Sequence, residues 1–173
     1  MKKEFNITGN CISDEHYMMD NSEKFEDVIE LIERGKYFTM NHPRQFGKTT
    51  MLFQLADALE KAEEYLPITL NFQGVDRSSH ESDVAFGQMF VEQLAQDLEL
   101  NHPTLHQFVD TYKKITDLND VSKLITQLVQ KANKKIVILI DEVDASSNYI
   151  AFLSFLAMLR NKYLNRARIP TFH

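Results

Sequence analysis

The stretch NHPRQFGKTT, residues 41–50, combines a glycine, a lysine and two threonines in an order typical of phosphate-binding loops. Its end matches the pattern G-x-x-x-x-G-K-[ST], but His42 stands where that pattern begins with glycine. KYFTM (36–40) precedes it and is rich in strand formers, whereas a helical pattern follows from Thr49. A strand, a loop and a helix in this order bring the positive end of a helix to the loop. We therefore expect this segment to bind phosphate.

The residue types at the end of the loop suit a nucleotide bound with magnesium. Lys48 is expected to reach the β- and γ-phosphates, and the Thr49 hydroxyl to ligate Mg²⁺. Thr50 is expected to contact the α-phosphate. A Gly-Lys-Thr tripeptide alone is weak evidence, so the prediction depends on the strand and helix around it.

The glycine that matters most is present. Gly47 must let the backbone approach a phosphate closely, whereas His42 lies where the chain leaves the expected strand. Pro43 has no N–H to donate, so the backbone donors must follow it. The predicted nucleotide-binding residues are Pro43, Arg44, Gln45, Phe46, Gly47, Lys48, Thr49 and Thr50.

A second segment, KIVILIDEVD (135–144), supplies acids at the end of an apolar run. Five consecutive apolar residues predict a strand buried on both faces. Asp141 is expected to hold Mg²⁺ through water, and Glu142 to polarise the attacking water, with Lys48 as the other catalytic residue. The purely structural interpretation is a strand end with solvated acids, followed by a helix cap such as Asp144.

Helical and strand patterns alternate along the chain. Helices are predicted over 20–35, with Asp20 or Ser22 as cap and Gly35 as stop, and over 49–62, 82–100, 104–114, 119–134 and 147–165. Strands are predicted over 36–41, 67–74 and 135–144. This alternation predicts an α/β fold with a mainly parallel sheet covered by helices.

The composition excludes several classes of protein. At 173 residues the chain fits one domain, and the apolar segment 149–159 is shorter than a membrane span. A single cysteine, Cys11, and the lack of an apolar N-terminal stretch favour the cytoplasm. The net charge of −6 argues against nucleic-acid binding, so the basic segments 131–135 and 160–168 are interpreted as solvated helix ends.

PRQFGKTT together with ILIDEVD resembles the prokaryotic AAA-like P-loop ATPases of the additional-catalytic-glutamate class. The opening segment 5–20 is similar to the N-terminal segment of the same group, so the resemblance covers nearly the whole chain. It implies a three-layer P-loop NTPase sheet with helices on both faces. It also implies an N-terminal segment over 1–35 and an ATPase core over 36–173.

The resemblance further implies features outside the two motifs. The stretch around His16 and Tyr17 corresponds in position to a segment near the adenine. The sequence ends at 168–173, about where the next strand is expected, so we expect a C-terminally incomplete core from a longer or a decayed ATPase. Arginines of the last helix could act on a neighbouring copy, although a solvated helix end is the simpler interpretation; they are Arg160, Arg166 and Arg168.

Three functions remain open from the sequence. The first is an AAA-like module that binds and hydrolyses ATP with Mg²⁺ and moves a protein partner or a further C-terminal domain, with homo-oligomers as one option. The second is a nucleotide-binding switch or scaffold with little turnover. The third is a nucleic-acid-associated module that uses the basic segments. A GTP-specific site is disfavoured because no Asn-Lys-x-Asp signature is present.

Overall fold

The computed structural model describes residues 22–41, 47–112, 114–143, 146–147, 149–166 and 168. The chain forms two compact units, Met1–Lys61 and Ala62–His173. Each unit is described by itself below. The predicted division into 1–35 and 36–173 remains a prediction.

The described part of the first unit contains two helices, α1 (Ser22–Glu33) and α2 (Lys48–Lys61). Helix α1 ends because Gly35 adopts a left-handed conformation, with a φ of 58°. Its N–H donates to the carbonyl of Ile32 at 2.8 Å, and the N–H of Lys36 donates to Leu31 at 2.9 Å. These two bonds form a Schellman motif, which a residue with a Cβ adopts only at a cost. The predicted stop at Gly35 is confirmed.

Residues 36–41 differ from the prediction, because they belong to neither a helix nor a strand. Their composition favours a strand, and Tyr37 is exposed. A strand requires a neighbouring strand to accept and donate its backbone hydrogen bonds. Strand-forming residues alone do not supply such a neighbour, and here the strand prediction is wrong.

The second unit contains two strands, β1 (Tyr65–Asn71) and β2 (Lys135–Asp141), which pair in parallel. The register runs from Tyr65 beside Lys135 to Asn71 beside Asp141, so the two strands end at the same level. The parallel sheet predicted from the strand–helix alternation is confirmed for this pair. The predicted strand 67–74 begins two residues earlier than expected.

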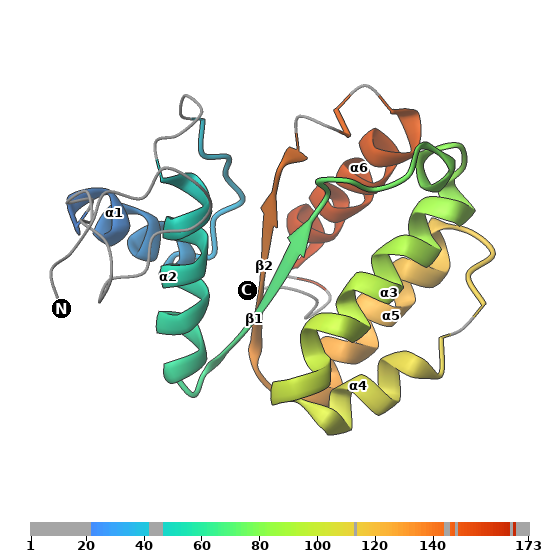
Figure 1. Ribbon diagram of the computed structural model, residues 1–173. Helices are drawn as coiled ribbons and strands as arrows, with labels where there is room; N and C mark the ends of the chain where they lie inside the picture. Colours follow the sequence, from blue (N-terminus) through green and yellow to red (C-terminus); the bar gives the residue numbers. More distant parts are fainter. Residues whose placement is uncertain are drawn as a thin grey trace, which may run out of the picture. The chain divides into compact units, whose positions relative to one another are not determined.

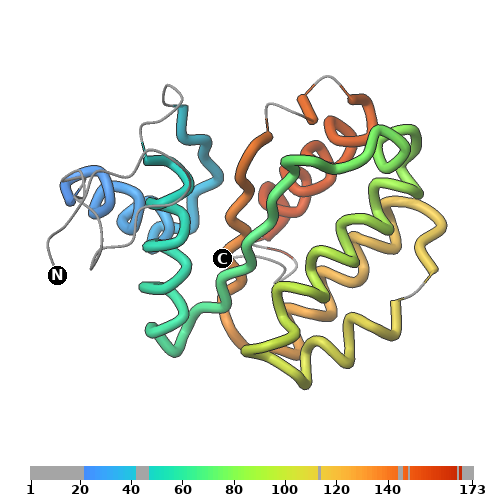
Figure 2. Tube along the Cα trace, viewed as in Figure 1, coloured from blue at the N-terminus to red at the C-terminus, as the bar shows by residue number. Residues whose placement is uncertain are grey.

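The connection between the strands is helical. Figure 2 shows the chain leaving β1, crossing to a long helix and returning through further helices to β2. Figure 1 shows two helices of this connection, α3 and α5, on one side of the strands. Helix α6, which follows β2, lies on the same side. In chain order the elements after β1 are η1 (Arg77–His80), α3 (Asp83–Asn101), α4 (Pro103–Asp110), α5 (Leu118–Ala132), then β2, and after it α6 (Ile150–Asn165).

Local chemistry explains where these helices begin and end. The side chain of Ser82 caps α3 by accepting from the N–H of Ala85 at 3.1 Å. Asp117 caps α5 by accepting from the N–H of Asp120 at 3.1 Å. Helix α5 ends at Asn133, whose left-handed φ of 51° is tolerated by asparagine better than by most residues.

The core of the second unit lies between the strands and these helices. Phe72, which follows β1, contacts Phe86 of α3 and Phe152 of α6, each at 5.6 Å between ring centroids. Phe155 extends the cluster to Phe86, at 5.2 Å. Edge-on aromatic pairs of this kind add about 0.5–1.5 kcal/mol each beyond their area burial. They join β1, α3 and α6 into one packed body.

Burial of β2 is less complete than predicted. Ile136 and Leu139 are buried, whereas Val137, Ile138 and Ile140 are only half-buried. Within the described residues β2 has one paired neighbour, β1, so one of its edges lacks a strand partner there. The α/β class is confirmed, while the three-layer sheet with helices on both faces remains a prediction.

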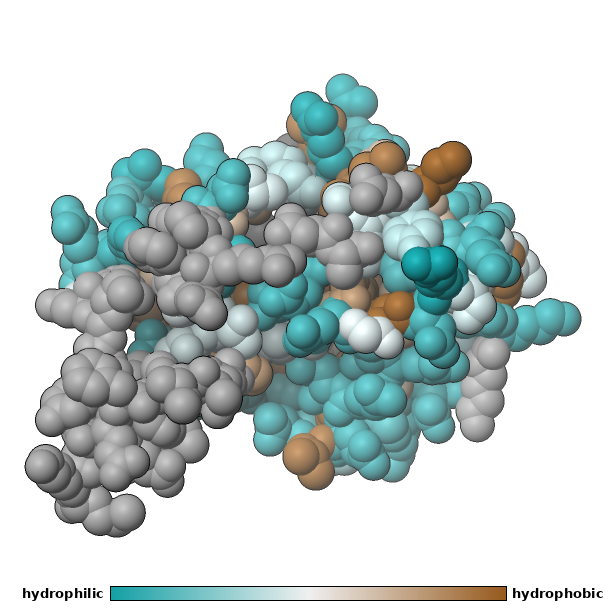
Figure 3. All heavy atoms as spheres, turned by 45° about the horizontal axis from the view of Figure 1, so that its top comes forward, coloured by the Kyte–Doolittle hydropathy of each residue, from teal (hydrophilic) through white to brown (hydrophobic). Residues whose placement is uncertain are grey.

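Helix α6 is confirmed, but it is not buried all round. Phe152 and Phe155 lie in the core, whereas Ile150 is 80% exposed and Leu153 is 52% exposed. On the face drawn in Figure 3 the described residues are mostly hydrophilic, and the hydrophobic ones form small separate spots. Among the helices of the described ranges, none combines the length and the apolar character needed to cross a membrane.

Candidate functional site

One candidate segment is the start of α2, within the first unit. Gly47 has a positive φ of 71°, and its carbonyl accepts from the N–H of Met51 at 2.9 Å. Gly47 is therefore the N-cap, and Lys48, Thr49 and Thr50 form the first turn of the helix. The N–H groups of a first turn point out of the helix end, where the backbone dipole is positive.

The predicted contact residues of the loop divide into two groups. Gly47 and the Lys-Thr-Thr of the first turn are half-buried and lie together at the helix start. The other predicted residues, Pro43, Arg44, Gln45 and Phe46, lie outside the described residues, as do His42, His16 and Tyr17. The structure therefore describes Gly47, the glycine that is expected to let the backbone approach a phosphate.

The other candidate segment is the end of β2, within the second unit. Asp141 is the last residue of the strand and is 8% exposed. Its carbonyl accepts from the N–H of Phe72 at 3.3 Å, and its Oδ1 accepts from the N–H of Glu142 at 2.9 Å. The N–H of Glu142 thus orients the buried carboxylate, while the bond from Phe72 holds the end of β2 beside the residue that follows β1.

Glu142 has an unusual backbone. Its φ is 55°, in the left-handed region that non-glycine residues rarely adopt, and its side chain is exposed. Backbone strain of this kind occurs often at functional sites, where neighbouring structure holds it in place. The sequence predicted the role of Glu142 but gave no sign of this conformation.

The residues beside the acids were not predicted from the sequence. Asn71, the register partner of Asp141, accepts from the N–H of Gln73 through its side chain at 2.7 Å. The side-chain amide of Gln93 on α3 donates to the Asn71 carbonyl at 2.9 Å. These bonds fix the carboxyl end of β1 next to the end of β2. An isolated Asn or Gln in a sequence carries no signal that would reveal such a contact.

A buried histidine holds the turn that follows the acids. His80, at the end of η1, is 6% exposed, and its Nε2 lies 2.9 Å from the hydroxyl of Ser146, which is fully buried. Its Nδ1 lies 3.2 Å from the carbonyl of Asp76. The ring also packs on Tyr149, at 4.4 Å between centroids. Asp144, the predicted cap in the same turn, lies outside the described residues.

The arginines of the last helix have different surroundings. Arg160 is exposed, whereas Arg166 lies over the Tyr163 ring at 3.8 Å and donates to the Tyr163 carbonyl at 2.8 Å. The Nζ of Lys162 donates to the Thr126 hydroxyl of α5 at 2.6 Å, and burial lowers the pKa of this lysine. At least two cations of the basic segment 160–168 therefore contribute to packing within the unit.

Two of the predicted residues carry oxygen atoms of the kind that magnesium ions prefer. Thr49 offers a hydroxyl oxygen and Asp141 a carboxylate oxygen, and Mg²⁺ prefers such hard oxygen ligands. Within the described ranges no group of three or more His, Cys, Asp or Glu side chains is arranged to hold a metal.

Comparison with known proteins gives the family. A helix N-terminus built on Gly-Lys-Thr and a parallel strand ending in Asp-Glu are the two elements of ATPase-type, nucleotide-binding modules. A family model described as an AAA-like domain matches residues 10–173, so the chain belongs to the AAA-like domain family. Searches of curated proteins and of solved structures found no significant match.

Proposed function

We propose that this protein binds ATP with Mg²⁺ and hydrolyses it. The observation that carries the proposal is the start of α2, where Gly47 with its positive φ is followed by Lys-Thr-Thr in the first helical turn. Backbone N–H groups and the helix dipole then act at one place, and the first turn carries a lysine, which together suit the charge of a triphosphate. Membership of the AAA-like domain family supports the same class of ligand.

In the proposed complex each predicted residue has a role of its own. The Lys48 ammonium neutralises the β- and γ-phosphates, and the Thr49 hydroxyl and the Asp141 carboxylate hold the magnesium ion, Asp141 through water. Magnesium offsets charge on the phosphates when it is bound. The Glu142 carboxylate orients the attacking water and accepts its proton.

Turnover of Mg-ATP by purified protein tests the proposal. We expect phosphate release that Lys48→Ala abolishes together with nucleotide binding. Glu142→Gln is expected to keep binding and to lower kcat by about 10²- to 10⁴-fold, the usual range for a general base. Phosphate release can be followed by a coupled assay, and binding by calorimetry on the same samples.

Two matched variants serve as controls. Lys61→Ala removes an exposed lysine from the other end of α2, where its ammonium pairs with Asp57. Glu99→Gln removes an exposed carboxylate from α3. Both are expected to leave turnover unchanged. Turnover that Lys48→Ala and Lys61→Ala affect equally would refute the assignment of the phosphate site.

The same assay separates this proposal from a nucleotide-binding switch. Mg-ATP binding that Lys48→Ala abolishes, without measurable phosphate release, would support the switch. A partner protein, a further domain or a second copy that responds to the nucleotide belongs to the same proposal, with the cytoplasm as the proposed location. Retention on DNA that falls with salt and is unaffected by Lys48→Ala would favour the nucleic-acid function instead.

A further inference from the structure

The turn that follows β2 must keep Glu142 in an unfavourable conformation. A glutamate in the left-handed region costs free energy relative to the extended or helical regions, so the surrounding bonds must hold it there. The bond from its N–H to Asp141 Oδ1 fixes one side of the residue. The other side depends on the turn that leads to α6.

That turn is closed by backbone bonds centred on Ser146. The N–H of Ser146 donates to the Val143 carbonyl at 3.1 Å, and the N–H of Tyr149 donates to the Ser146 carbonyl at 3.0 Å. Ser146 therefore links the residue after Glu142 to the residue before α6. Any movement of Ser146 would be passed directly to the backbone of Glu142 through Val143.

His80 is the group that fixes Ser146. A carbonyl oxygen can only accept, so the bond to Asp76 requires a proton on His80 Nδ1. In the neutral ring Nε2 is then an acceptor, and the buried Ser146 hydroxyl donates to it. Phe86 and Tyr149 pack against the imidazole, at 5.7 and 4.4 Å between centroids, and prevent it from turning away.

We propose that His80 is a positioning residue, which acts through Ser146 to keep Glu142 in its left-handed conformation. Its catalytic consequence rests on the proposed function, in which Glu142 is the general base. His80 touches neither nucleotide nor water in this role. It joins the segment after β1 to the segment after β2, so the end of the sheet that carries the acids is held as one body.

Two substitutions of His80 separate its two bonds. His80→Gln places an amide near the position of Nε2 and can keep the bond to Ser146, whereas His80→Asn reaches only as far as Nδ1. Ser146→Ala removes the same bond from the other side. His106→Asn is a matched control, because the Nδ1 of His106 also bonds a carbonyl, that of Ala95, at 2.9 Å, away from the acids.

The first measurement reports on the backbone and does not require activity. The Cα and Cβ chemical shifts of Glu142 distinguish a left-handed from an extended residue, and they are measured with folded full-length variants. His80→Asn and Ser146→Ala are expected to move these shifts, while His80→Gln and His106→Asn leave them unchanged. Unchanged Glu142 shifts in both His80→Asn and Ser146→Ala would overturn the proposal.

The second measurement is Mg-ATP turnover by the same variants. His80→Asn and Ser146→Ala are expected to lower kcat by about 10- to 100-fold with an unchanged KM, because the general base is displaced while the phosphate loop is intact. The double variant is expected to lose no more than either single variant. Glu142 shifts that move without any change in kcat would overturn the positioning role.

Failure of the proposed function gives a different result. If the wild type shows no turnover that depends on Lys48, the ATPase assignment falls, whereas the Glu142 shifts still decide whether His80 holds that residue. If kcat fell equally in His80→Asn and in His106→Asn, the unit would be loosened in general. That result would count against a positioning role for His80.

Discussion

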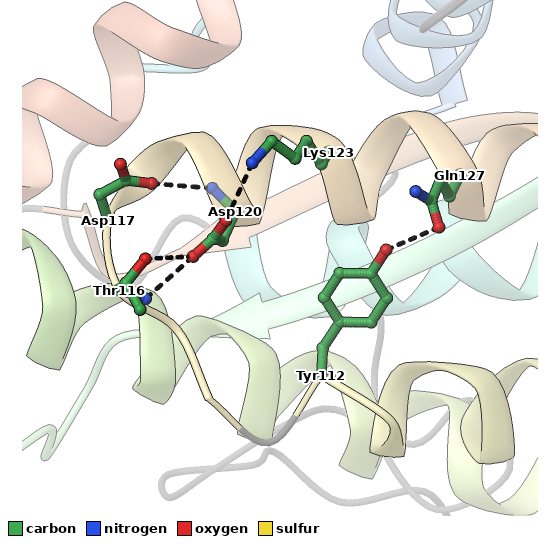
Figure 4. Close-up of polar contacts among 6 residues, drawn as sticks. All are labelled: Tyr112, Thr116, Asp117, Asp120, Lys123 and Gln127. Atoms are coloured by element: carbon green, nitrogen blue, oxygen red, sulfur yellow. Dashed lines mark hydrogen bonds and ion pairs between the residues drawn. The ribbon is translucent and has the colours of Figure 1, made fainter.

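Asp120 shows how a single side chain can set a pH dependence in this protein. The hydroxyl and the N–H of Thr116 donate to its Oδ2 at 2.6 and 3.0 Å, and Lys123 lies 3.2 Å from its Oδ1 (Figure 4). The hydroxyl bond is the largest cause, followed by the backbone bond and Lys123, and together they lower the pKa from 3.8 to about 2.

The direction of the shift gives the first prediction at this scale. Because the folded pKa of Asp120 is depressed, its contribution to stability is present above about pH 4 and is lost as the pH falls toward 2. Asp120→Asn should reduce the drop in denaturant midpoint between pH 6 and pH 3. Asp110→Asn, on α4, is the control substitution, and its drop in denaturant midpoint is compared with that of Asp120→Asn. Equal pH dependence in wild type and Asp120→Asn would contradict the prediction.

Sequence reasoning succeeded at this scale where one residue type carries the chemistry. Gly35 and Gly47 have the positive φ that glycine adopts most easily, and Asp141 stands at the end of its strand as predicted, whereas the roles of Gly47 and Asp141 at a nucleotide remain predictions. The His80–Ser146 bond was not predicted, because its partners are 66 residues apart and neither belongs to a motif. Such pairs become visible only once the fold brings them together.

At the scale of elements, α3 lies close to the connection between α4 and α5 because of a glycine. A Cβ on Gly87 would lie 2.8 Å from Cγ2 of Ile115 and 3.0 Å from Cγ2 of Val121. Both neighbours are buried and branched at Cβ, so these methyl groups cannot swing away. Glycine in the middle of a helix otherwise weakens it.

Gly87→Ala therefore tests packing against helix propensity. Overpacking costs about 1–3 kcal/mol, while the better helix former returns at most about 1 kcal/mol. We expect a net loss of stability in denaturant titrations, of about 1–2 kcal/mol. Gln88→Ala, one residue along and exposed, should stay within about 0.5 kcal/mol of wild type. A stabilised Gly87→Ala would show that the contact relaxes freely.

Elements were predicted well where apolar spacing is regular. In the predicted helix 119–134, the apolar residues at helical spacing are all buried in α5; they are Val121, Leu124, Ile125 and Leu128. The expected strand 36–41 was wrong: its residues have the composition of a strand, but they pair with no strand in the part of the chain that the structure describes. The composition of a segment can be read directly from the sequence. Strand pairing depends on a second segment, and a single sequence does not show which segment that is.

At the scale of the whole molecule, the second unit has a hydrophobic core of its own. Every residue of the main buried cluster lies within Ala62–His173, including Leu66 and Leu70 of β1 and Phe155 of α6. A unit with its own core can fold independently in principle.

We therefore expect residues 62–173 to fold when produced alone. The measurement is a nitrogen–proton correlation spectrum with dispersed peaks, together with a cooperative thermal transition. Phe86→Ala, which removes the ring that contacts Phe72 and Phe155, should lower the stability of this fragment by about 3–5 kcal/mol. A collapsed spectrum for the unsubstituted fragment would show that residues 1–61 are required for folding.

The parallel register has a consequence for the time course of synthesis. Tyr65 pairs with Lys135, so β1 leaves the ribosome 70 residues before its partner. At about 5–20 residues per second this interval is roughly 4–14 s, during which β1 has no strand to pair with. Helix α3 is synthesised within that interval, and in the folded unit it packs in the same core as Leu66, Ile68 and Leu70 of β1, so its formation would cover the apolar side of that strand. The long helix after the first strand thereby shields a nascent chain from association with its neighbours.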